Sequence, residues 1–312
     1  MSRLLSTVFG KSAAAPTTVR IAESPANISY VLASFRWHMD TRPPAKVIAV
    51  HDYLGSCASL QQLLNESVAD LPLSRLTPTE PLEVYCTDLR GHNFSEAAPM
   101  TSASAYPLAC AADIIKMQKD ILRSEAGILG LGFGSLIASC AALHAPEAFS
   151  SLTLFVNEIS QLQRCLPSSY PVGDILRGAP ANATGLTELN DYLRDRVRDP
   201  AERAALLATV EMRHGVTRFR FSNDLLQYTE PLVLSAPAGG KFTKPTVVYL
   251  CGRDGTVSSE EEALVRTRFP AVQFVKLDTQ GETLTSSNQR LAPLFLQSCS
   301  MLGEINEATM EQ

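Results

Sequence analysis

One short run of the sequence has the form of a turn that carries a nucleophile. Residues 130–134 read Gly-Leu-Gly-Phe-Gly and lie where the apolar stretch 127–131 passes into the helical stretch 136–144. In a G-x-S-x-G turn, the central serine attacks a carbonyl carbon, and the flanking glycines let strand and helix approach closely. The central residue here is Gly132, so the attacking hydroxyl is absent. Ser135 lies inside the following helix without flanking glycines and is not expected to replace it.

Three further loops follow strand-like stretches in the order that acyl-transfer chemistry would require. Residues 51–56 (HDYLGS) stand where an H-G-x-x-G-S loop would supply a backbone amide to an oxyanion. Residues 88–95 (DLRGHNFS) are similar to a D-x-R-x-H-G-x-S loop. Asp254 follows the apolar stretch 246–250, where the acid of a catalytic triad would lie. Four such loops in this order are more specific than any one alone.

The elements that must position these loops alternate between strand-length and helix-length segments. Continuous apolar strands, each followed by a helix, are typical of a parallel sheet that is covered on both faces. The sequence therefore predicts an α/β fold with a mostly parallel central sheet. The predicted strands are 47–51, 82–87, 127–131, 152–156, 246–250 and 272–277, and the predicted helices are 59–71, 108–122 and 136–144.

The rhythm of strands and helices is interrupted once, which suggests an insertion into one core. Residues 160–243 contain several prolines, a charged helical stretch at 186–211 and the basic-aromatic run 218–221. We expect a mostly helical cap here. The core then comprises residues 26–159 and 244–303, preceded by a segment at 1–25 and followed by an acidic tail at 304–312.

These loops and elements together resemble the α/β-hydrolase superfamily. Within it, the chain is most similar to the mitochondrial abhydrolase-domain protein eleven type and its bacterial esterase relatives, over roughly residues 30–302. The resemblance implies an eight-stranded, mostly parallel sheet with helices on both faces. It also implies a helical cap that includes 189–226, and Ser-Asp-His esterase or thioesterase chemistry.

The residues that would perform this chemistry are not all present. Within the resemblance, the loop for the catalytic histidine reads Thr-Gln-Gly-Glu-Thr at 279–283, which places Glu282 at the histidine position. Independently of that alignment, none of the histidines follows residue 250; they are His38, His51, His92, His144 and His214. A triad needs a base that takes the hydroxyl proton near neutral pH. Asp254 therefore has no imidazole to orient, and we expect it to cap the turn after its strand instead.

The oxyanion loop is altered as well. Its positions are Asp52, Tyr53 and Phe133, and Asp52 stands where the pattern has glycine. Its negative charge opposes the stabilisation that an oxyanion hole provides. With the triad positions reading Gly132, Asp254 and Glu282, the sequence predicts a hydrolase fold with no functional catalytic residue, a pseudoenzyme.

Composition and spacing argue against several ligand classes. A net charge of −5 is unfavourable for a protein that grips phosphate backbones, so Arg213, Arg218 and Arg220 are interpreted as a solvated face. No P-loop or G-x-G-x-x-G motif is present, and no cofactor is expected. His51, Asp52, His92 and Asp254 could meet at one end of the sheet, but they lack metal-site spacing, so no metal is expected. The seven cysteines are scattered and are interpreted as buried apolar residues in a reducing compartment.

The first 22 residues have the pattern of a targeting segment. They contain Arg3, Lys11 and Arg20 with no acidic residue, and Leu4, Leu5, Val8 and Phe9 share one helical face. This pattern favours a mitochondrial transit peptide over a secretory signal, with a disordered basic tail as the alternative. No apolar stretch is long enough to span a membrane. We expect the protein in the mitochondrial matrix.

Three functional hypotheses follow from these observations. The leading one is a structural, scaffold or assembly subunit of a mitochondrial multiprotein complex, such as the mitoribosome or a respiratory complex, with other mitochondrial proteins as partners. The second is a sensor that binds a small molecule or acyl group in a pocket under the cap. The third is a residual enzyme that hydrolyses esters or thioesters without serine, in which Asp254 or Glu282 activates water.

Overall fold

The computed structural model describes residues 25–35, 41–70, 81–97, 102–165, 172–180, 185–198, 200–213, 216–228, 230–251, 257–277, 291, 294–295 and 298. The predicted targeting segment, the acidic tail and the two triad positions Asp254 and Glu282 lie outside these ranges, apart from residue 25. Within the ranges, no helix has the length and apolar character needed to cross a bilayer.

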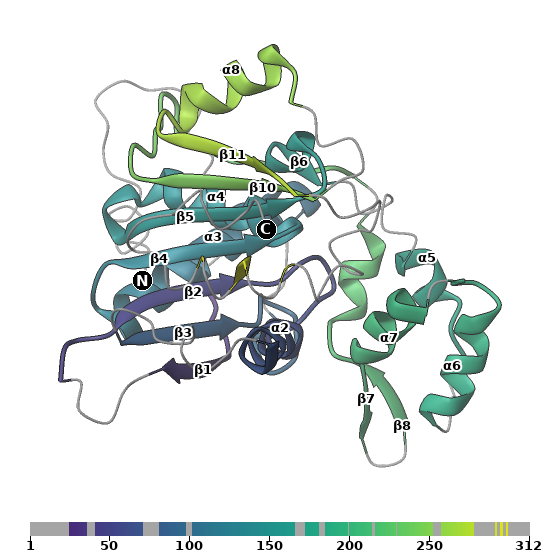
Figure 1. Ribbon diagram of the computed structural model, residues 1–312. Helices are drawn as coiled ribbons and strands as arrows, with labels where there is room; N and C mark the ends of the chain where they lie inside the picture. The colour runs from purple at the N-terminus through teal and green to yellow at the C-terminus, as the bar shows by residue number, and fades with distance from the viewer. Residues whose placement is uncertain are drawn as a thin grey trace.

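Seven strands of the described chain form one central sheet in the order β1-β3-β2-β4-β5-β10-β11 (Figure 1). Neighbouring strands run parallel, except for β1, which pairs antiparallel with β3 at one edge. The bounds are Tyr30–Phe35 for β1, Ala45–Val50 for β2, Leu82–Thr87 for β3, Ala126–Leu131 for β4, Phe149–Val156 for β5, Thr246–Leu250 for β10 and Val272–Lys276 for β11.

Both faces of the sheet are buried, as the continuous apolar strands predicted. Ile48 and Val50 of β2 belong to the core that contains the buried residues of α3 and α4. Their neighbours Val47 and Ala49 belong to a second core with the buried residues of α2. This alternation places α2 on one face and α3 and α4 on the other. The main helices are α2 (Cys57–Asp70), α3 (Tyr106–Met117), α4 (Phe133–His144) and α8 (Ser259–Arg268).

The six predicted core strands are all present, with ends shifted by a few residues. Strand β1 was not predicted from the sequence, although residues 30–33 (YVLA) are apolar. It lies at the edge of the sheet, where its residues alternate between exposed and half-buried. The resemblance implied eight strands, whereas the described ranges contain seven in this sheet. The helix predicted at 108–122 ends its α-helical part at Met117 and continues as a π-helical turn, Gln118–Leu122.

The cap contains the helices that were predicted, and also a β-hairpin that was not. The helical stretch predicted at 186–211 forms two helices and then enters a strand. The following basic-aromatic run lies at the end of a β-hairpin. The cap elements are η4 (Ile159–Leu162), β6 (Arg164–Cys165), α5 (Val172–Arg177), α6 (Leu186–Arg194), α7 (Pro200–Ala208), β7 (Val210–Arg213), β8 (Val216–Phe219), η6 (Asn223–Gln227) and β9 (Leu232–Val233). In Figure 1, α5, α6, α7 and the β7–β8 hairpin form a lobe on the side where the parallel strands end.

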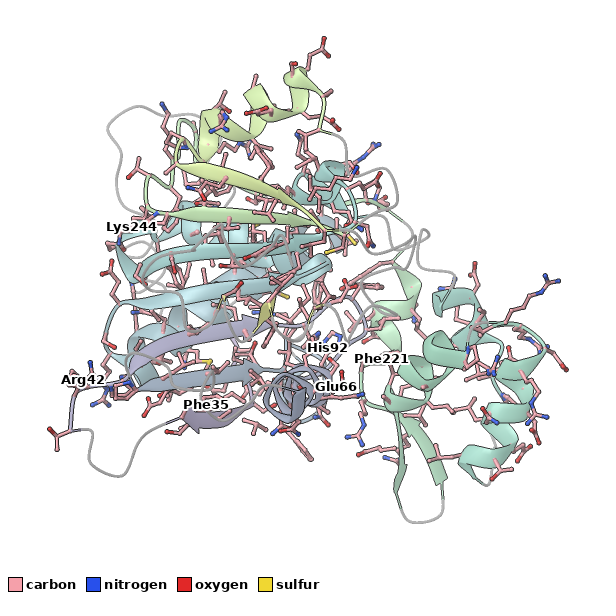
Figure 2. The ribbon with its side chains drawn as sticks, viewed as in Figure 1. Phe35, Arg42, Glu66, His92, Phe221 and Lys244 are labelled. Atoms are coloured by element: carbon pink, nitrogen blue, oxygen red, sulfur yellow. The ribbon has the colours of Figure 1, made fainter. Side chains whose placement is uncertain are left out.

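Specific contacts join this lobe to the loops of the core. His92, in the loop after β3, forms an isolated antiparallel bridge with Phe221 of the cap, and the two residues face each other in Figure 2. The amide of Ser222 donates to the carbonyl of Gly91 at 2.6 Å. The Tyr53 hydroxyl donates to the carbonyl of Leu225 at 2.5 Å. The cap is therefore seated on the loops in which the sequence located its candidate site.

Candidate functional site

Gly132 forms the sharp turn between β4 and α4. Its backbone angles are φ 52° and ψ −116°, a conformation that side-chain-bearing residues adopt only with strain. The neighbouring glycine is required by close packing, because a Cβ on Gly134 would lie 2.3 Å from the carbonyl oxygen of Val50. In the α/β-hydrolase fold, a strained turn between strand and helix carries the nucleophile. The backbone geometry of the nucleophile turn is thus present here, but its central residue, Gly132, has no side chain.

Two backbone amides converge beside this turn. The N–H of Phe133, the residue after the turn, donates to Asp52 Oδ1 at 2.6 Å. The N–H of Tyr53, from the loop after β2, donates to the same oxygen at 2.7 Å. In this fold, the amide after the nucleophile and an amide from this type of loop together form the oxyanion hole. Both donors are therefore engaged by one carboxylate oxygen of the chain itself.

The Asp52 carboxylate also occupies the space beside Gly132 into which a side chain would extend. A Cβ built on Gly132 would lie 2.2 Å from Asp52 Oδ1 and 2.3 Å from its Cγ. Non-bonded carbon and oxygen atoms do not approach so closely, so one of the two residues would have to move. The Asp52 side chain is accommodated in this position because residue 132 is glycine.

His51 fixes the backbone of the same loop. Its Nδ1–H donates to the carbonyl of Asp52 at 2.7 Å, and its Nε2 accepts from the amide of Leu89 at 3.1 Å. These two contacts define a neutral imidazole protonated at Nδ1. Complete burial lowers the pKa of His51 below its usual value of 6.5. His51 is therefore a structural link between the loops after β2 and β3, with both ring nitrogens engaged by main-chain groups.

His92 packs against His51 with 4.7 Å between ring centroids. Its Nδ1 lies 3.2 Å from the carbonyl of Arg90, to which it donates. Burial and the neighbouring imidazole hold the pKa of His92 well below 6.5, so this ring is also neutral at pH 7. Within the described part of the chain, no group of three His, Cys, Asp or Glu residues is arranged to hold a metal ion. Of the metal-site candidates, Asp254 lies outside that part.

Ser135 is placed away from the amide pair. Its hydroxyl is fully buried and lies 2.8 Å from the carbonyl of Gly130 and 3.0 Å from that of Phe155. Both are main-chain acceptors at the base of the turn. The hydroxyl therefore ties helix α4 to strands β4 and β5, and no described imidazole contacts it.

A chain of aromatic contacts links the oxyanion loop to the cap. Tyr53 and Phe133 meet edge to face with centroids 5.5 Å apart, and Tyr106 stacks on Phe133 at 5.9 Å. Tyr106 in turn contacts Tyr228 of the cap. Burial raises the pKa of Tyr53, which keeps its hydroxyl protonated for the bond to Leu225. The rings stabilise the oxyanion loop against the cap.

The loop after β3 is held by buried charge. Arg90 is buried and forms a bidentate pair with Asp113 of α3, with nitrogen–oxygen distances of 2.6 and 2.7 Å. The N-terminal segment joins this pair, because the amide of Ala26 donates to Asp113 at 2.6 Å. Asp88 accepts from the amide of Cys57 at 2.8 Å, which caps the start of α2. Asp88 and Arg90 therefore hold the loop after β3 against α2 and α3.

The cysteines of the described ranges are buried thiols that form no disulfide with one another. Burial raises the pKa of Cys57, Cys86, Cys140 and Cys251 to about 12, which disfavours the reactive thiolate. Their buried apolar role agrees with the interpretation from the sequence.

The sequence placed Asp52, Tyr53 and Phe133 in one oxyanion loop, and the structure brings all three beside Gly132. It did not reveal that the Asp52 side chain turns inward and accepts from both amides. The available signal was the combination of an aspartate where the pattern has glycine with a glycine where the pattern has serine. Together these two changes remove the side chain at residue 132 and place the Asp52 carboxylate in the space beside it.

Comparisons with known proteins agree with this geometry. Residues 72–283 match the family model for the alpha/beta hydrolase fold. A marine microorganism esterase superposes with a TM-score of 0.65 at 15% sequence identity, over 88% of this chain and 100% of its own. The N-formylmaleamic acid deformylase of Pseudomonas putida S16 gives 0.57 at 15% identity, over 87% of this chain and 96% of its own.

The same architecture is found in an epimerase. The bottromycin epimerase, in complex with bottromycin A2, has a TM-score of 0.52 at 15% identity and is covered over its whole length by 89% of this chain. At such identities these likenesses show the fold alone. A comparison with curated protein sequences finds no match. From the family match and the geometry around Gly132, the chain belongs to the alpha/beta hydrolase fold family.

Proposed function

We propose that this protein is a catalytically inactive α/β-hydrolase relative that serves as a structural, scaffold or assembly subunit of a mitochondrial multiprotein complex. The observation that carries the loss of catalysis is the position of Asp52. Its Oδ1 accepts from the amides of Tyr53 and Phe133, the two donors that would otherwise stabilise a reaction intermediate. An oxyanion would have to form where a carboxylate already lies.

The position of Asp52 is expected to slow catalysis more than the loss of a single oxyanion donor would. Removing one donor from an oxyanion hole slows catalysis by roughly 10²–10³-fold. Here the Asp52 carboxylate, which is negative like an oxyanion, accepts from both donors, and Gly132 supplies no nucleophile. Glu282 at the expected histidine position, and the resemblance to the abhydrolase-domain protein eleven type, support the same interpretation of a degenerate triad.

A surface at the edge of the sheet supports a role in binding other proteins. Strand β1 pairs with β3 on one side, and its other side has no strand partner within the described ranges. Tyr30 and Leu32 of β1 are 38% and 45% exposed, and the nearby Phe94 is 75% exposed. Ser29 and Ser95, which adjoin Tyr30 and Phe94 in sequence, share a hydrogen bond of 2.8 Å. An open strand edge with exposed apolar side chains favours a protein partner that adds a strand.

The mitochondrial location is supported by the basic, acid-free residues 1–22. A reporter fused to the full chain is expected in mitochondria, and a fusion that lacks residues 1–22 is expected in the cytosol. If the truncated fusion still reaches mitochondria, the location does not depend on this segment.

The assembly role is tested with the tagged protein in mitochondrial lysate. We expect it to co-sediment with a large complex in a density gradient and to keep its partners after a high-salt wash. The variant Leu32→Lys places a charge on β1 and is expected to shift the protein toward the free fraction. Leu264→Lys is the matched control, since Leu264 of α8 is 49% exposed away from β1. Sedimentation of the wild type only as a free species near 34 kDa would contradict the proposal.

A further inference from the structure

A cavity of about 670 Å³ lies within the cap, among α5, α6, β8 and η6. Sites for small molecules are typically cavities of roughly 300–1,000 Å³ with mostly apolar walls. The described residues that line this cap cavity all belong to the cap, and none of them belongs to the oxyanion loop or to the turn at Gly132. The cap cavity is therefore separate from the degenerate hydrolase site and requires its own explanation.

The wall of the cap cavity is built from apolar side chains. Leu176, Leu189 and Leu226 line it and are buried members of the hydrophobic core. On the side of the hairpin, Phe219 packs against the same core and stacks on Phe221, with 5.1 Å between ring centroids and 7° between ring planes. Such a wall offers aliphatic and aromatic contacts to a ligand.

The charged residues of the β7–β8 hairpin lie on its other face. Successive side chains of a strand point to opposite faces, and directly opposed residues of an antiparallel pair share a face. Phe219 therefore shares a face with Val210, its buried cross-strand partner. Arg218 shares the opposite face with Glu211, whose carboxylate lies 3.9 Å from Arg220. The Arg218 side chain is thus directed away from the apolar wall that Phe219 helps to form.

Arg177, at the end of α5, also lines the cap cavity, but its guanidinium is already engaged. It donates to the carbonyl of Leu226 and pairs with the carboxylate of Asp174. An anionic ligand would have to compete with Asp174 or leave its charge in water, because burying an unpaired charge is costly. The cap cavity therefore favours a ligand that carries no charge.

We propose that the cap cavity binds an uncharged, apolar small molecule, with its aliphatic chain or ring against Leu189, Phe219 and Leu226. The apolar body gains free energy by leaving water, and close contact with the wall adds dispersion attraction. Binding does not depend on the scaffold role, since no described residue that lines the cavity lies on β1, the edge assigned to a protein partner.

Binding is measured on the purified full chain with N-phenyl-1-naphthylamine, an uncharged probe whose fluorescence rises in apolar surroundings. We expect saturable binding at one site and displacement of the probe by dodecanol. Dodecanoate is expected to displace the probe about tenfold less effectively, because its carboxylate finds no available partner in the cavity. Equal displacement by the two compounds, or no saturable binding of the probe, would overturn the proposal.

The place of binding is tested by filling the cap cavity. Ala179→Trp adds a large ring at the wall and is expected to abolish probe binding, with an unchanged circular dichroism spectrum as the test of folding. Ala58→Trp is the matched control, because Ala58 is exposed on α2 outside the cavity, and its Kd for the probe is expected to equal that of the wild type. Probe binding that survives Ala179→Trp, or that is lost equally in both variants, would overturn the proposal.

A second pair of variants gives the same test without a larger side chain. Phe219→Ala removes one ring of the wall and is expected to weaken probe binding about tenfold. Arg218→Glu, at the adjacent residue of β8, is expected to leave the Kd unchanged, because its side chain leaves the hairpin on the other face. Unchanged binding in Phe219→Ala, or equal weakening in both, would contradict the proposed site.

Discussion

The carboxylate of Asp52 and the Cα of Gly132 lie so close that no side chain fits between them. The nearest carboxylate oxygen is 2.2 Å from the position that a Cβ on Gly132 would occupy. Asp52 holds this position through the amides of Tyr53 and Phe133, so the loop after β2 and the turn after β4 are joined by one side chain. A change at either residue therefore alters the surroundings of the other.

The variant Gly132→Ser is expected to be less stable than the wild type by about 1–3 kcal/mol. A serine must adopt the positive φ of this turn and also displace the Asp52 carboxylate. Urea unfolding measures the change. Gly185→Ser is the control, because Gly185 has extended angles and open space around it, and is expected to change stability little. Equal stability of Gly132→Ser and the wild type would show that this turn is not constrained.

The variant Asp52→Ala is expected to lower the free energy of unfolding by about 1–3 kcal/mol, because two backbone donors lose a charged acceptor. Acetate is expected to restore part of this stability by binding between the same amides. The measurement is the Tm of the variant in sodium acetate and in sodium chloride of equal ionic strength. The wild type and Asp174→Ala, a change at an exposed carboxylate, should respond equally to both salts. A loss that acetate does not reduce would argue against an intact anion site.

No hydrolysis of p-nitrophenyl acetate or butyrate is expected above the rate of a denatured control. The nucleophile is absent at Gly132, and Asp52 occupies the oxyanion donors. Gly132→Ser alone, and even combined with Glu282→His, is expected to fall well short of a working esterase while Asp52 remains. Activity that disappears in Ser135→Ala would contradict both the assignment of Gly132 and the structural role given to Ser135.

Stability is expected to fall as the pH drops from about 6.5 toward 4. Burial lowers the pKa of His144 to about 4, and it lowers the pKa values of His51 and His92 as well. The unfolded chain therefore binds more protons than the folded chain in this range, and each such histidine contributes up to roughly 1.4 kcal/mol per pH unit.

Urea unfolding at pH 7.5, 6.0 and 5.0 measures this dependence. His144→Gln removes one of the titrating groups, so its free energy of unfolding should fall less steeply with decreasing pH than that of the wild type. Carboxylates titrate equally in both proteins and cancel in the comparison. Identical slopes would mean that His144 is not neutral by burial.

The core strands and the turn at Gly132 could be predicted from the sequence because their signals are local. A run such as Val47–Val50 is apolar at every position because it is buried on both faces, and this leaves a continuous pattern in the chain. The Gly-x-Gly-x-Gly run likewise records the close approach of β4 and α4 in adjacent residues. The absence of a serine at residue 132 was equally visible.

Other features depended on contacts between residues that are distant in the chain. Strand β1 is an edge strand whose residues pair with residues of β3 that lie 47 to 57 positions further along the chain, so no local pattern reveals the pairing. The cap hairpin has strands of only four residues each, and contacts such as the bridge between His92 and Phe221 join this part of the cap to the core.

The sequence by itself determined that Asp52 brings a negative charge to the oxyanion loop and that Gly132 has no side chain. The direction of the Asp52 carboxylate was decided only by the tertiary structure, because the amide of Phe133 comes from the turn after β4, 81 residues along the chain. A carboxylate turns toward whichever donors the folded chain brings near it, and that proximity is a property of the packed sheet rather than of the residues next to Asp52.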